Sequence, residues 1–339
     1  MIAFRNYLAI SILLLGFLSV YIPVRYQASY PAQLGPRFDS RVRTTYTDLL
    51  NEQQPEVLLF GDSMLEPAID LRVVEKRLGR KTTLVSLPGT ASTIWYLMLK
   101  NNIVLAEHKP KYLVLFFRDA MMTVPGYRVT GRYFEQIDEF ASPKDILLIE
   151  RAYINQMSPF EKIVEAYVPL YSSRWNIRQS IDYYIRYTLG RLMLGCSSAC
   201  VDNAMEVVLD ANNLDLTFLS EALASSDEYF YTQERLDFDD QVDKSFLPEV
   251  IQLCKENHIQ LIMVRMPISR FEEPGTEPAG LNPYIQKLDT YLEQNNVPFF
   301  DFDQKELTEE YFTDSLHLNE RGRAIFTEKL TESLMTLIK

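Results

Sequence analysis

The sequence predicts an α/β protein built on a doubly wound parallel sheet, with an amino-terminal transmembrane helix and a large, mainly helical insertion. Three observations support this fold class. Short apolar runs alternate with segments of helical periodicity, the runs are absent from the middle of the chain, and the first 25 residues are nearly uncharged. With 339 residues, 47% of them hydrophobic and 24% charged, the chain is long enough to fill a core and unlike a disordered protein.

The amino terminus has the length of a membrane span. Nineteen uncharged residues lie between Arg5 and Arg25, and as a helix they would reach roughly 28 Å. A signal peptide has a shorter apolar region followed by a small-x-small cleavage site, and only Gln27-Ala28-Ser29 comes near that pattern. We therefore predict an uncleaved anchor over residues 1–25, with a cleaved signal peptide and a buried core helix as the alternatives.

The sequence gives weaker evidence for the side of the membrane on which the domain after the span lies. More arginines follow the span than precede it, which opposes export by the positive-inside rule, but long soluble domains cross largely regardless of nearby charge. Cys196 and Cys200 lie in CSSAC and could form a disulfide, which would imply an oxidising compartment. Two free thiols are the alternative, because spacing does not fix geometry. We expect a single-pass protein of the bacterial cell membrane with its catalytic domain outside the cytoplasm.

Three strands are predicted in the first third of the chain after the anchor. Residues 26–55 form a tether that contains a short helix. The apolar run EVLLF then ends at Gly61-Asp62-Ser63, TTLVSL ends at Pro88-Gly89, and KYLVLFF resembles a strand buried on both faces. Helical periodicity separates them, at about residues 68–78 and over 91–107.

The strand pattern returns only near residue 245. The helix SFLPEVIQLCKEN, the strand IQLIMVRM, the helix YIQKLDTYLEQN, the strand VPFFDF and a terminal helix from about Glu320 follow in order. Between the third and fourth strands, helical stretches rich in tyrosine and charge predict an insertion. The expected organisation is an anchor (1–25), a tether (26–55), an α/β domain (56–119 and 245–339) and a helical insertion (120–244).

Charge and motifs exclude several function classes. The chain has a net charge of −12, and since the first 30 residues contribute +2, the remainder carries −14. A nucleic-acid binder should be basic, so a nuclease or phosphodiesterase is disfavoured. The sequence has no metal-ligand cluster, phosphate-cradling glycine loop or dinucleotide fingerprint. We expect neither a metal nor a cofactor.

Residues suited to acyl transfer follow the predicted strands, where open α/β sheets bind their ligands. Ser63 follows the first strand and is a weak nucleophile unless a base takes its proton. His317 is the best placed of three histidines, because Asp314 precedes it by three residues and a helical turn would bring the two side chains to one face. The carboxylate would fix the imidazole tautomer and leave the other nitrogen for Ser63. The alternatives without a catalytic role are that Ser63 is a turn residue, Asp314 a helix cap and His317 a solvated loop residue.

This order of motifs resembles the SGNH (GDSL) hydrolase superfamily over residues 56–119 and 250–335. The resemblance implies that Ser63 is the nucleophile, Gly89 the glycine of the second block, and Asp314 and His317 the acid and base. The asparagine of the third block is missing, and Arg118 stands in its place in LFFRDAM.

Two further residues are candidates for the oxyanion and substrate site. Gly89 suits a turn by its conformational freedom, and we expect its backbone N–H to serve the oxyanion together with that of Ser63. Arg118 either forms an ion pair with Asp119 or a nearby carboxylate, or replaces the missing asparagine and grips an anionic group of the substrate. We expect Asp62 to order the turn.

The main functional hypothesis is a serine esterase or O-acyltransferase that works through an acyl-Ser63 intermediate, resolved by water or by another hydroxyl. An anchor followed by such a domain with a long insertion is similar to the exported partners of membrane-bound O-acyltransferases, which act in alginate or cellulose acetylation and teichoic-acid D-alanylation. The resemblance implies an acyl donor, an envelope polysaccharide acceptor and a membrane-bound O-acyltransferase as partners. The alternative is an inactive scaffold that presents polymer to such an enzyme, suggested by the lost asparagine.

Overall fold

The computed structural model describes residues 2–131, 133–188, 191–192, 195, 197–198, 200–201, 229–269, 277–303 and 307–338. The chain divides into two compact units, Met1–Pro36 with Ile154–Ser225, and Arg37–Tyr153 with Ser226–Lys339. The second unit contains the sheet. It also contains residues 120–153 and 226–244, which the sequence analysis assigned to the insertion.

The sheet has five parallel strands in the order β2-β1-β3-β4-β5. The strands are β1 (Val57–Gly61), β2 (Thr82–Ser86), β3 (Tyr112–Phe117), β4 (Gln260–Arg265) and β5 (Phe299–Asp301). In the register of the sheet, Phe60 lies opposite Val85 on one side and Leu115 on the other. The parallel sheet and the helices between its strands confirm the predicted α/β fold class.

The apolar strands are buried because helices cover both faces of the sheet. Every residue of β1 and β3 is buried, as expected for continuous hydrophobic runs in a parallel sheet. The chain leaves β1 toward β2 in one direction and returns past β1 to β3 in the other. Since crossovers are right-handed, the helices of these two connections lie on opposite faces. The carboxyl ends of β1 and β3 therefore flank the crevice where such folds bind ligands.

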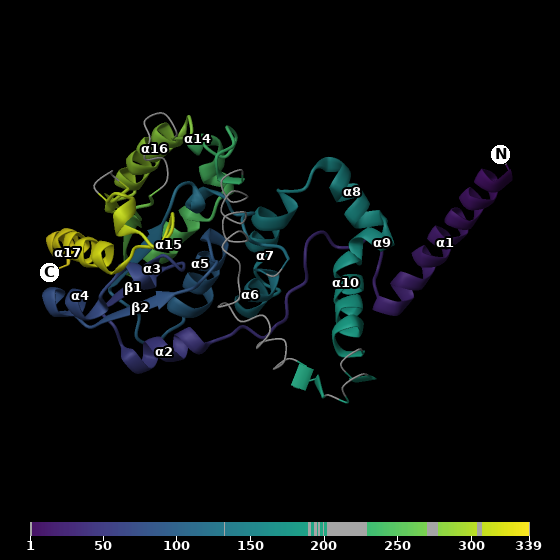
Figure 1. Cartoon of the computed structure of the whole chain (residues 1–339), viewed down its shortest axis with the longest axis horizontal. Coiled ribbons are helices and arrows are strands. Elements are labelled where there is room, and N and C mark those ends of the chain that lie inside the picture. The colour runs from purple at the N-terminus through teal and green to yellow at the C-terminus, as the bar shows by residue number, and fades with distance from the viewer. Residues whose placement is uncertain are drawn as a thin grey trace. The chain divides into compact units, whose positions relative to one another are not determined.

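Short helices connect the strands of the second unit (Figure 1). The helices α3, α4 and α17 pack together, and α5 packs against α6 and α15. The bounds are α2 (Thr45–Gln53), α3 (Leu65–Ala68), α4 (Leu71–Leu78), α5 (Ser92–Met98), η1 (Leu99–Ile103), η2 (Met121–Thr123), α6 (Tyr133–Phe140), α7 (Ile146–Leu148), η3 (Ile149–Ile154), α14 (Phe238–Gln241), η6 (Val242–Lys244), α15 (Leu247–Glu256), α16 (Leu281–Gln294), η7 (Glu309–Tyr311) and α17 (Glu320–Leu337).

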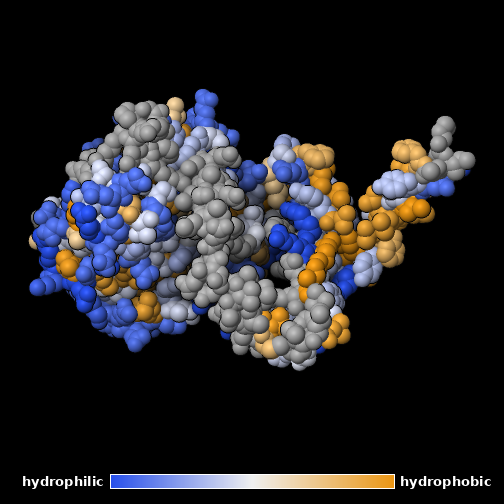
Figure 2. Space-filling model, in the orientation of Figure 1, coloured by the Kyte–Doolittle hydropathy of each residue, from blue (hydrophilic) through white to orange (hydrophobic). Residues whose placement is uncertain are grey.

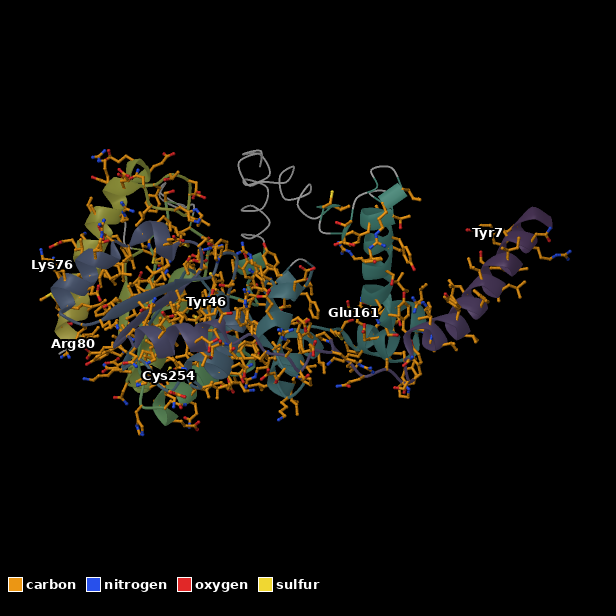
Figure 3. All side chains as sticks on the ribbon, turned by 90° about the horizontal axis from the view of Figure 1, so that it is seen from below. Tyr7, Tyr46, Lys76, Arg80, Glu161 and Cys254 are labelled. Atoms are coloured by element: carbon orange, nitrogen blue, oxygen red, sulfur yellow. The ribbon has the colours of Figure 1, made fainter. Side chains whose placement is uncertain are left out.

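Two predicted helices differ in detail. The helix expected at about 68–78 begins only at Leu71, as α4, because the chain is extended at Ile69 and Asp70 and the Asp70 side chain caps α4 by accepting from the N–H of Arg72. The separate short helix α3 precedes it. The segment 91–107 begins as α5 and continues as a π-helical turn, η1. Cys254 on α15 is a buried free thiol (Figure 3).

The first unit is helical in its described part. It contains α1 (Ile2–Tyr26), α8 (Pro159–Tyr167), α9 (Pro169–Ser172), α10 (Arg174–Tyr183) and η4 (Tyr184–Thr188). The stretch Phe4–Tyr26 of α1 is long and apolar enough to cross a membrane, and its length and composition equally suit a signal sequence. Figure 3 shows Tyr7 projecting from this helix, and Figure 2 shows its hydrophobic surface.

The disulfide expected between Cys196 and Cys200 is only partly within the described residues. Cys200 is disulfide-bonded, whereas Cys196 lies outside the described residues. The tyrosine-rich stretch 182–191 is described as far as residue 188, and Tyr183 and Tyr184 in it are exposed.

Candidate functional site

The turn after β1 presents Ser63 at the carboxyl edge of the sheet. Gly61 ends the strand against β3, where an added Cβ would lie 3.1 Å from Phe116 Cβ and 3.2 Å from its carbonyl oxygen. Only glycine fits this approach without a shift of the backbone. Asp62 then orders the turn, because its buried carboxylate accepts a 3.0 Å hydrogen bond from the N–H of Met64. Ser63 follows, half-buried, just before α3.

Ser63, His317 and Asp314 form a continuous hydrogen-bonded chain. His317 Nε2 lies 3.2 Å from Ser63 Oγ, and His317 Nδ1 lies 2.8 Å and 3.1 Å from the two oxygens of Asp314. Two segments 254 residues apart in sequence thus meet at one edge of the sheet. With the Nδ1 proton donated to the carboxylate, Nε2 is free to accept the serine proton, which is the arrangement of a nucleophile, its base and the group that orients the base.

The Asp314–His317 contact arises from a loop and not from the helical turn used to predict it. Asp314 Oδ1 accepts from the backbone N–H groups of Leu316 and His317, both at 2.8 Å. Phe312 and Leu318 form an isolated antiparallel bridge that closes the loop, and Thr313 N–H donates to the His317 carbonyl. Aspartate side chains favour such local turns over a helix interior. The backbone N–H groups of the loop therefore hold the Asp314 carboxylate in place independently of its contact with the imidazole.

Asn319 anchors the loop and was not identified from the sequence. Its Oδ1 caps α17 by accepting from the N–H groups of Arg321 and Gly322, while its Nδ2 donates to the carbonyls of Glu310 and Phe312. A signal was present, because asparagine directly before a helix is a favoured N-cap. The residue therefore joins the end of the histidine loop to the start of the terminal helix.

Replacing Asn319 with alanine should weaken both stability and activity. Loss of the cap should lower the free energy of unfolding by about 1 kcal/mol. The loop that holds His317 would also lose its contacts to the carbonyls of Glu310 and Phe312. Chemical denaturation and ester hydrolysis by Asn319→Ala and by Asn319→Asp, which keeps the cap, should separate the two effects. Full activity of the alanine variant would show that the loop is held by other contacts.

Charge balance in the pair favours an ionised Asp314 and a basic His317. Burial raises the pKa of Asp314, but the hydrogen bonds from the His317 side chain and from the backbone N–H groups of Leu316 and His317 together outweigh it and lower that pKa to about 2. The hydrogen bond to Asp314 raises the pKa of His317 above its ordinary value of 6.5, against the opposing effect of burial. The imidazole is thus a stronger base than in water, and its protonated form is stabilised during proton transfer.

The raised pKa of His317 sets the acid limit of activity. A protonated imidazole cannot accept the Ser63 proton, so activity requires the neutral form. Because the pKa is raised, protonation begins at a higher pH, and kcat/KM should fall as the pH decreases through a midpoint above 6.5. A pH series with a neutral ester measures this limb. A midpoint below 6.5 would contradict the contact with Asp314 in solution.

Two backbone N–H groups, one after β1 and one after β2, are unused within the described part of the chain. The N–H groups of Ser63 and Gly89 make no hydrogen bond to any of the described residues. Gly89 has a φ of +75°, which favours glycine, and an added Cβ would lie 3.2 Å from Tyr133 Cε1. Unused N–H groups at a strand end suit the negative oxygen of a tetrahedral intermediate. The unused N–H and the positive φ of Gly89 are compatible with a role in binding the oxyanion, and that role stays a prediction.

Arg118 is placed as an internal ion pair. Its side chain is 3% exposed, its Nη1 lies 2.7 Å from Asp119 Oδ2, and its guanidinium packs over Phe230. Burial lowers the pKa of Arg118, but the charge of Asp119, together with smaller contributions from other acidic groups nearby, outweighs it and raises that pKa. Of the two expectations for this residue, the ion pair is present, and burial leaves little of the side chain to contact a substrate. We therefore do not assign Arg118 as the third donor of the oxyanion site.

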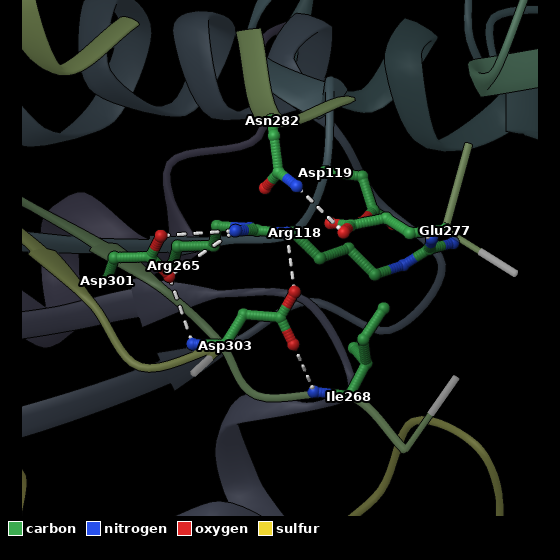
Figure 4. Close-up of polar contacts among 8 residues, drawn as sticks. All are labelled: Arg118, Asp119, Arg265, Ile268, Glu277, Asn282, Asp301 and Asp303. Atoms are coloured by element: carbon green, nitrogen blue, oxygen red, sulfur yellow. Dashed lines mark hydrogen bonds and ion pairs between the residues drawn. The ribbon is translucent and has the colours of Figure 1, made fainter. Parts of the chain in front are cut away.

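A second buried arginine lies behind this pair. Arg265, at the end of β4, contacts Asp301 at 3.1 Å and Asp303 at 2.5 Å. Asp303 also accepts from the N–H of Ile268 at 3.0 Å. Figure 4 shows these contacts next to Arg118 and Asp119. The network fixes the ends of β3, β4 and β5 below the site. Within the described residues no group of histidine, cysteine, aspartate and glutamate side chains is arranged to hold a metal ion.

Comparison with known proteins gives distant structural likenesses. No family model matches the chain, and no curated protein matches it. A putative acylhydrolase from Bacteroides fragilis aligns over 87% of this chain and 96% of its own, with a TM-score of 0.41 and 13% identity. A GDSL-like lipase from Bacteroides thetaiotaomicron aligns over 86% and 97%, with a TM-score of 0.38 and 11% identity. A mutant acetyl-xylooligosaccharide esterase from Geobacillus aligns over 87% and 96%, with a TM-score of 0.39 and 10% identity.

Proposed function

We propose that this chain is a serine-dependent acyl-ester hydrolase or O-acyltransferase that forms an acyl-Ser63 intermediate. The observation that supports this proposal is the contact of His317 with both Ser63 Oγ, at 3.2 Å, and Asp314, at 2.8 Å. A side chain with one nitrogen on a carboxylate and the other on a hydroxyl can move a proton from that hydroxyl. No other described histidine has this pair of partners.

The reaction has two halves. Ser63 Oγ attacks the ester carbonyl while His317 takes its proton, and the new negative oxygen is stabilised by the N–H groups of Ser63 and Gly89. His317 then protonates the leaving alcohol, and the acyl group stays on Ser63. In the second half water or an acceptor hydroxyl attacks the acyl-Ser63 ester while His317 takes the proton from that nucleophile. His317 then returns this proton to Ser63 Oγ as the bond between Oγ and the acyl carbon breaks, which releases the acid or the new ester.

We further propose that the acceptor is an extracytoplasmic polysaccharide and that the acyl group is acetyl or similar. The apolar helix α1 supports membrane attachment, and the resemblance noted in the sequence supports envelope polymers and a membrane-bound O-acyltransferase as partner. The inactive-scaffold alternative is less favoured, because a scaffold has no need of a histidine held between a carboxylate and a hydroxyl.

Release of nitrophenolate from p-nitrophenyl acetate by the full-length protein tests the intermediate. Acylation of Ser63 should release close to one equivalent in an initial burst, followed by slower turnover as the acyl-enzyme is resolved. Added oligosaccharides should speed the slow phase if a hydroxyl accepts the acyl group. Ser315→Ala, in the same loop as His317, is the control and should keep the burst. A protein that releases no nitrophenolate would contradict the proposal and favour the scaffold.

A further inference from the structure

Arg128 lies beside the glycine that the proposed mechanism uses for the oxyanion. An added Cβ on Gly89 would lie 3.8 Å from Arg128 Nη1 and 3.2 Å from the Tyr133 ring. The Arg128 guanidinium packs over Tyr127 and Tyr133, with its carbon 4.9 Å and 5.2 Å from the two ring centroids. Two aromatic faces thus hold a half-buried cation at the edge of the site.

This cation has no acidic partner within the described residues. Arg128 makes no ion pair there, and its guanidinium donates no hydrogen bond. Burial raises the pKa of Asp62 in the turn after β1, and the charges of Arg118, Arg128 and His317 partly offset this rise. Arg128 therefore lies close enough to act electrostatically on the site. Arg118 differs, because Asp119 neutralises it in the interior. Arg128 therefore has planar N–H donors that are oriented but unused.

The backbone of Arg128 supports a specific placement. Its φ is +54°, a left-handed conformation that non-glycine residues seldom adopt. Such strain persists where the surrounding structure holds it, and it is concentrated at functional sites. Here the conformation directs a charged side chain between two tyrosines and toward Gly89.

We propose that Arg128 binds a carboxylate or phosphate group of the substrate next to the ester that Ser63 attacks. This inference rests on the proposed function and adds the substrate class: an ester that carries an anionic group close to its acyl carbonyl. The backbone N–H groups of Ser63 and Gly89 already serve the oxyanion of the intermediate. A guanidinium held beside them can form charge-assisted hydrogen bonds to a second, fully charged oxygen.

Two matched esters test this inference with the full-length protein. p-Nitrophenyl acetate is neutral, and p-nitrophenyl hemisuccinate carries a carboxylate at the far end of its acyl chain. The change Arg128→Gln should raise the KM for the hemisuccinate about tenfold to hundredfold and change the acetate less than twofold. The control is Lys76→Gln, which removes the same charge from an exposed position near the carboxyl end of α4. That end of α4 leads into the start of β2, whereas the site lies at the carboxyl ends of the strands.

The possible outcomes are distinct. Equal losses on both esters, or no loss on either, would overturn the role of Arg128 in binding an anionic substrate group. A protein that hydrolyses neither ester before mutation would instead contradict the proposed function itself. Partial recovery of hemisuccinate binding by Arg128→Lys would support a charge interaction, since lysine keeps the charge without the planar donors.

The first unit carries a second and independent feature: helix α8 has its apolar side outward. Phe160, Ile163 and Tyr167 lie on one side of the helix and are 72%, 59% and 65% exposed. Glu165, on the other side, is buried and forms an ion pair with Arg174 of α10. A helix in water normally shows the reverse arrangement. Contiguous exposed apolar side chains of this kind indicate an interaction surface.

Helix α8 belongs to the same unit as the apolar helix α1, and α9 packs against both. Tyr26 at the end of α1 contacts Ser180 of α10 at 3.2 Å, and Tyr30 contacts Ser172 of α9 at 3.0 Å. The Ala32 N–H donates to the Ala166 carbonyl of α8 at 2.7 Å. The polar side of α8 is thus used within the unit, which leaves its apolar side exposed in the same unit as the hydrophobic helix α1 (Figure 2).

We infer that the apolar side of α8 inserts into lipid at the end of the membrane span. The occupant is lipid because α9 packs against both α8 and α1, and α1 is the helix that has the length and hydropathy of a span. In this arrangement α8 lies along the membrane boundary, with Glu165 and Arg174 paired away from the acyl chains.

Fluorescent labels at matched positions in liposomes test this inference. Full-length protein carries an environment-sensitive probe at Ile163→Cys or, on the polar side, at Glu161→Cys (Figure 3). Lipids with a nitroxide on the upper acyl chain should quench the probe at position 163 at least twofold more than at 161. Equal access of a water-soluble quencher to both would contradict insertion. Protection of position 163 from both quenchers would indicate a protein contact and would equally overturn it.

Discussion

Ser63→Ala should lower kcat for a neutral ester by about 10⁴- to 10⁶-fold, the largest effect expected of any substitution in this chain. Alanine removes the nucleophile, and the remaining donors can only stabilise attack by water. The fold should be unaffected, because Ser63 is half-buried and its Oγ contacts only His317 among the described residues. Thermal unfolding checks the fold, and Ser315→Ala is the matched control. A loss smaller than tenfold would mean that ester hydrolysis takes place without Ser63.

Asp314→Asn should lower kcat by about 10⁴-fold while leaving the loop in place. An asparagine Oδ1 can still accept from the N–H groups of Leu316 and His317, so the local turn is kept. Its side-chain amide, however, would donate toward His317 Nδ1, which favours the imidazole tautomer that cannot accept the Ser63 proton. The fall in activity therefore reports tautomer control and not loss of structure.

The same variant should also move the acid limb of activity. Asp314 raises the pKa of His317, so its neutral replacement should shift the midpoint of kcat/KM to lower pH. The pH profile of the residual activity measures this shift. An unchanged midpoint would show that another group, and not the contact of His317 with Asp314, sets the pH dependence.

Much of the fold could be predicted because parallel strands leave a strong local signal. The apolar runs at the predicted strands form β1 to β5, since strands buried on both faces need hydrophobic residues at nearly every position. The start of the helix expected at about 68–78 was placed too early and the short helix α3 before it was missed, because Asp70 caps α4 instead of continuing the helical pattern. Propensity alone does not distinguish these two uses of aspartate.

The candidate site was predictable where residue type and strand end coincide. Ser63 and His317 are in contact, as the order of motifs predicted, although the loop geometry of Asp314 differs from the expected helical turn. Arg128 could not be found from the sequence, because its closeness to Gly89 depends on how the segment after β3 packs against the turn that follows β2. The fate of Arg118 also depended on three-dimensional burial, which the adjacent Asp119 only suggested.

Covalent labelling with a fluorophosphonate, followed by mapping of the modified peptide, tests the central claim most directly. A phosphonate reacts with a serine hydroxyl only when a base removes its proton, so Ser63 should be labelled in the unmodified protein, and His317→Ala should lose the label. Exclusive modification of Ser63 is the predicted result. An unlabelled Ser63, or labelling that persists without His317, would contradict an activated serine at this site.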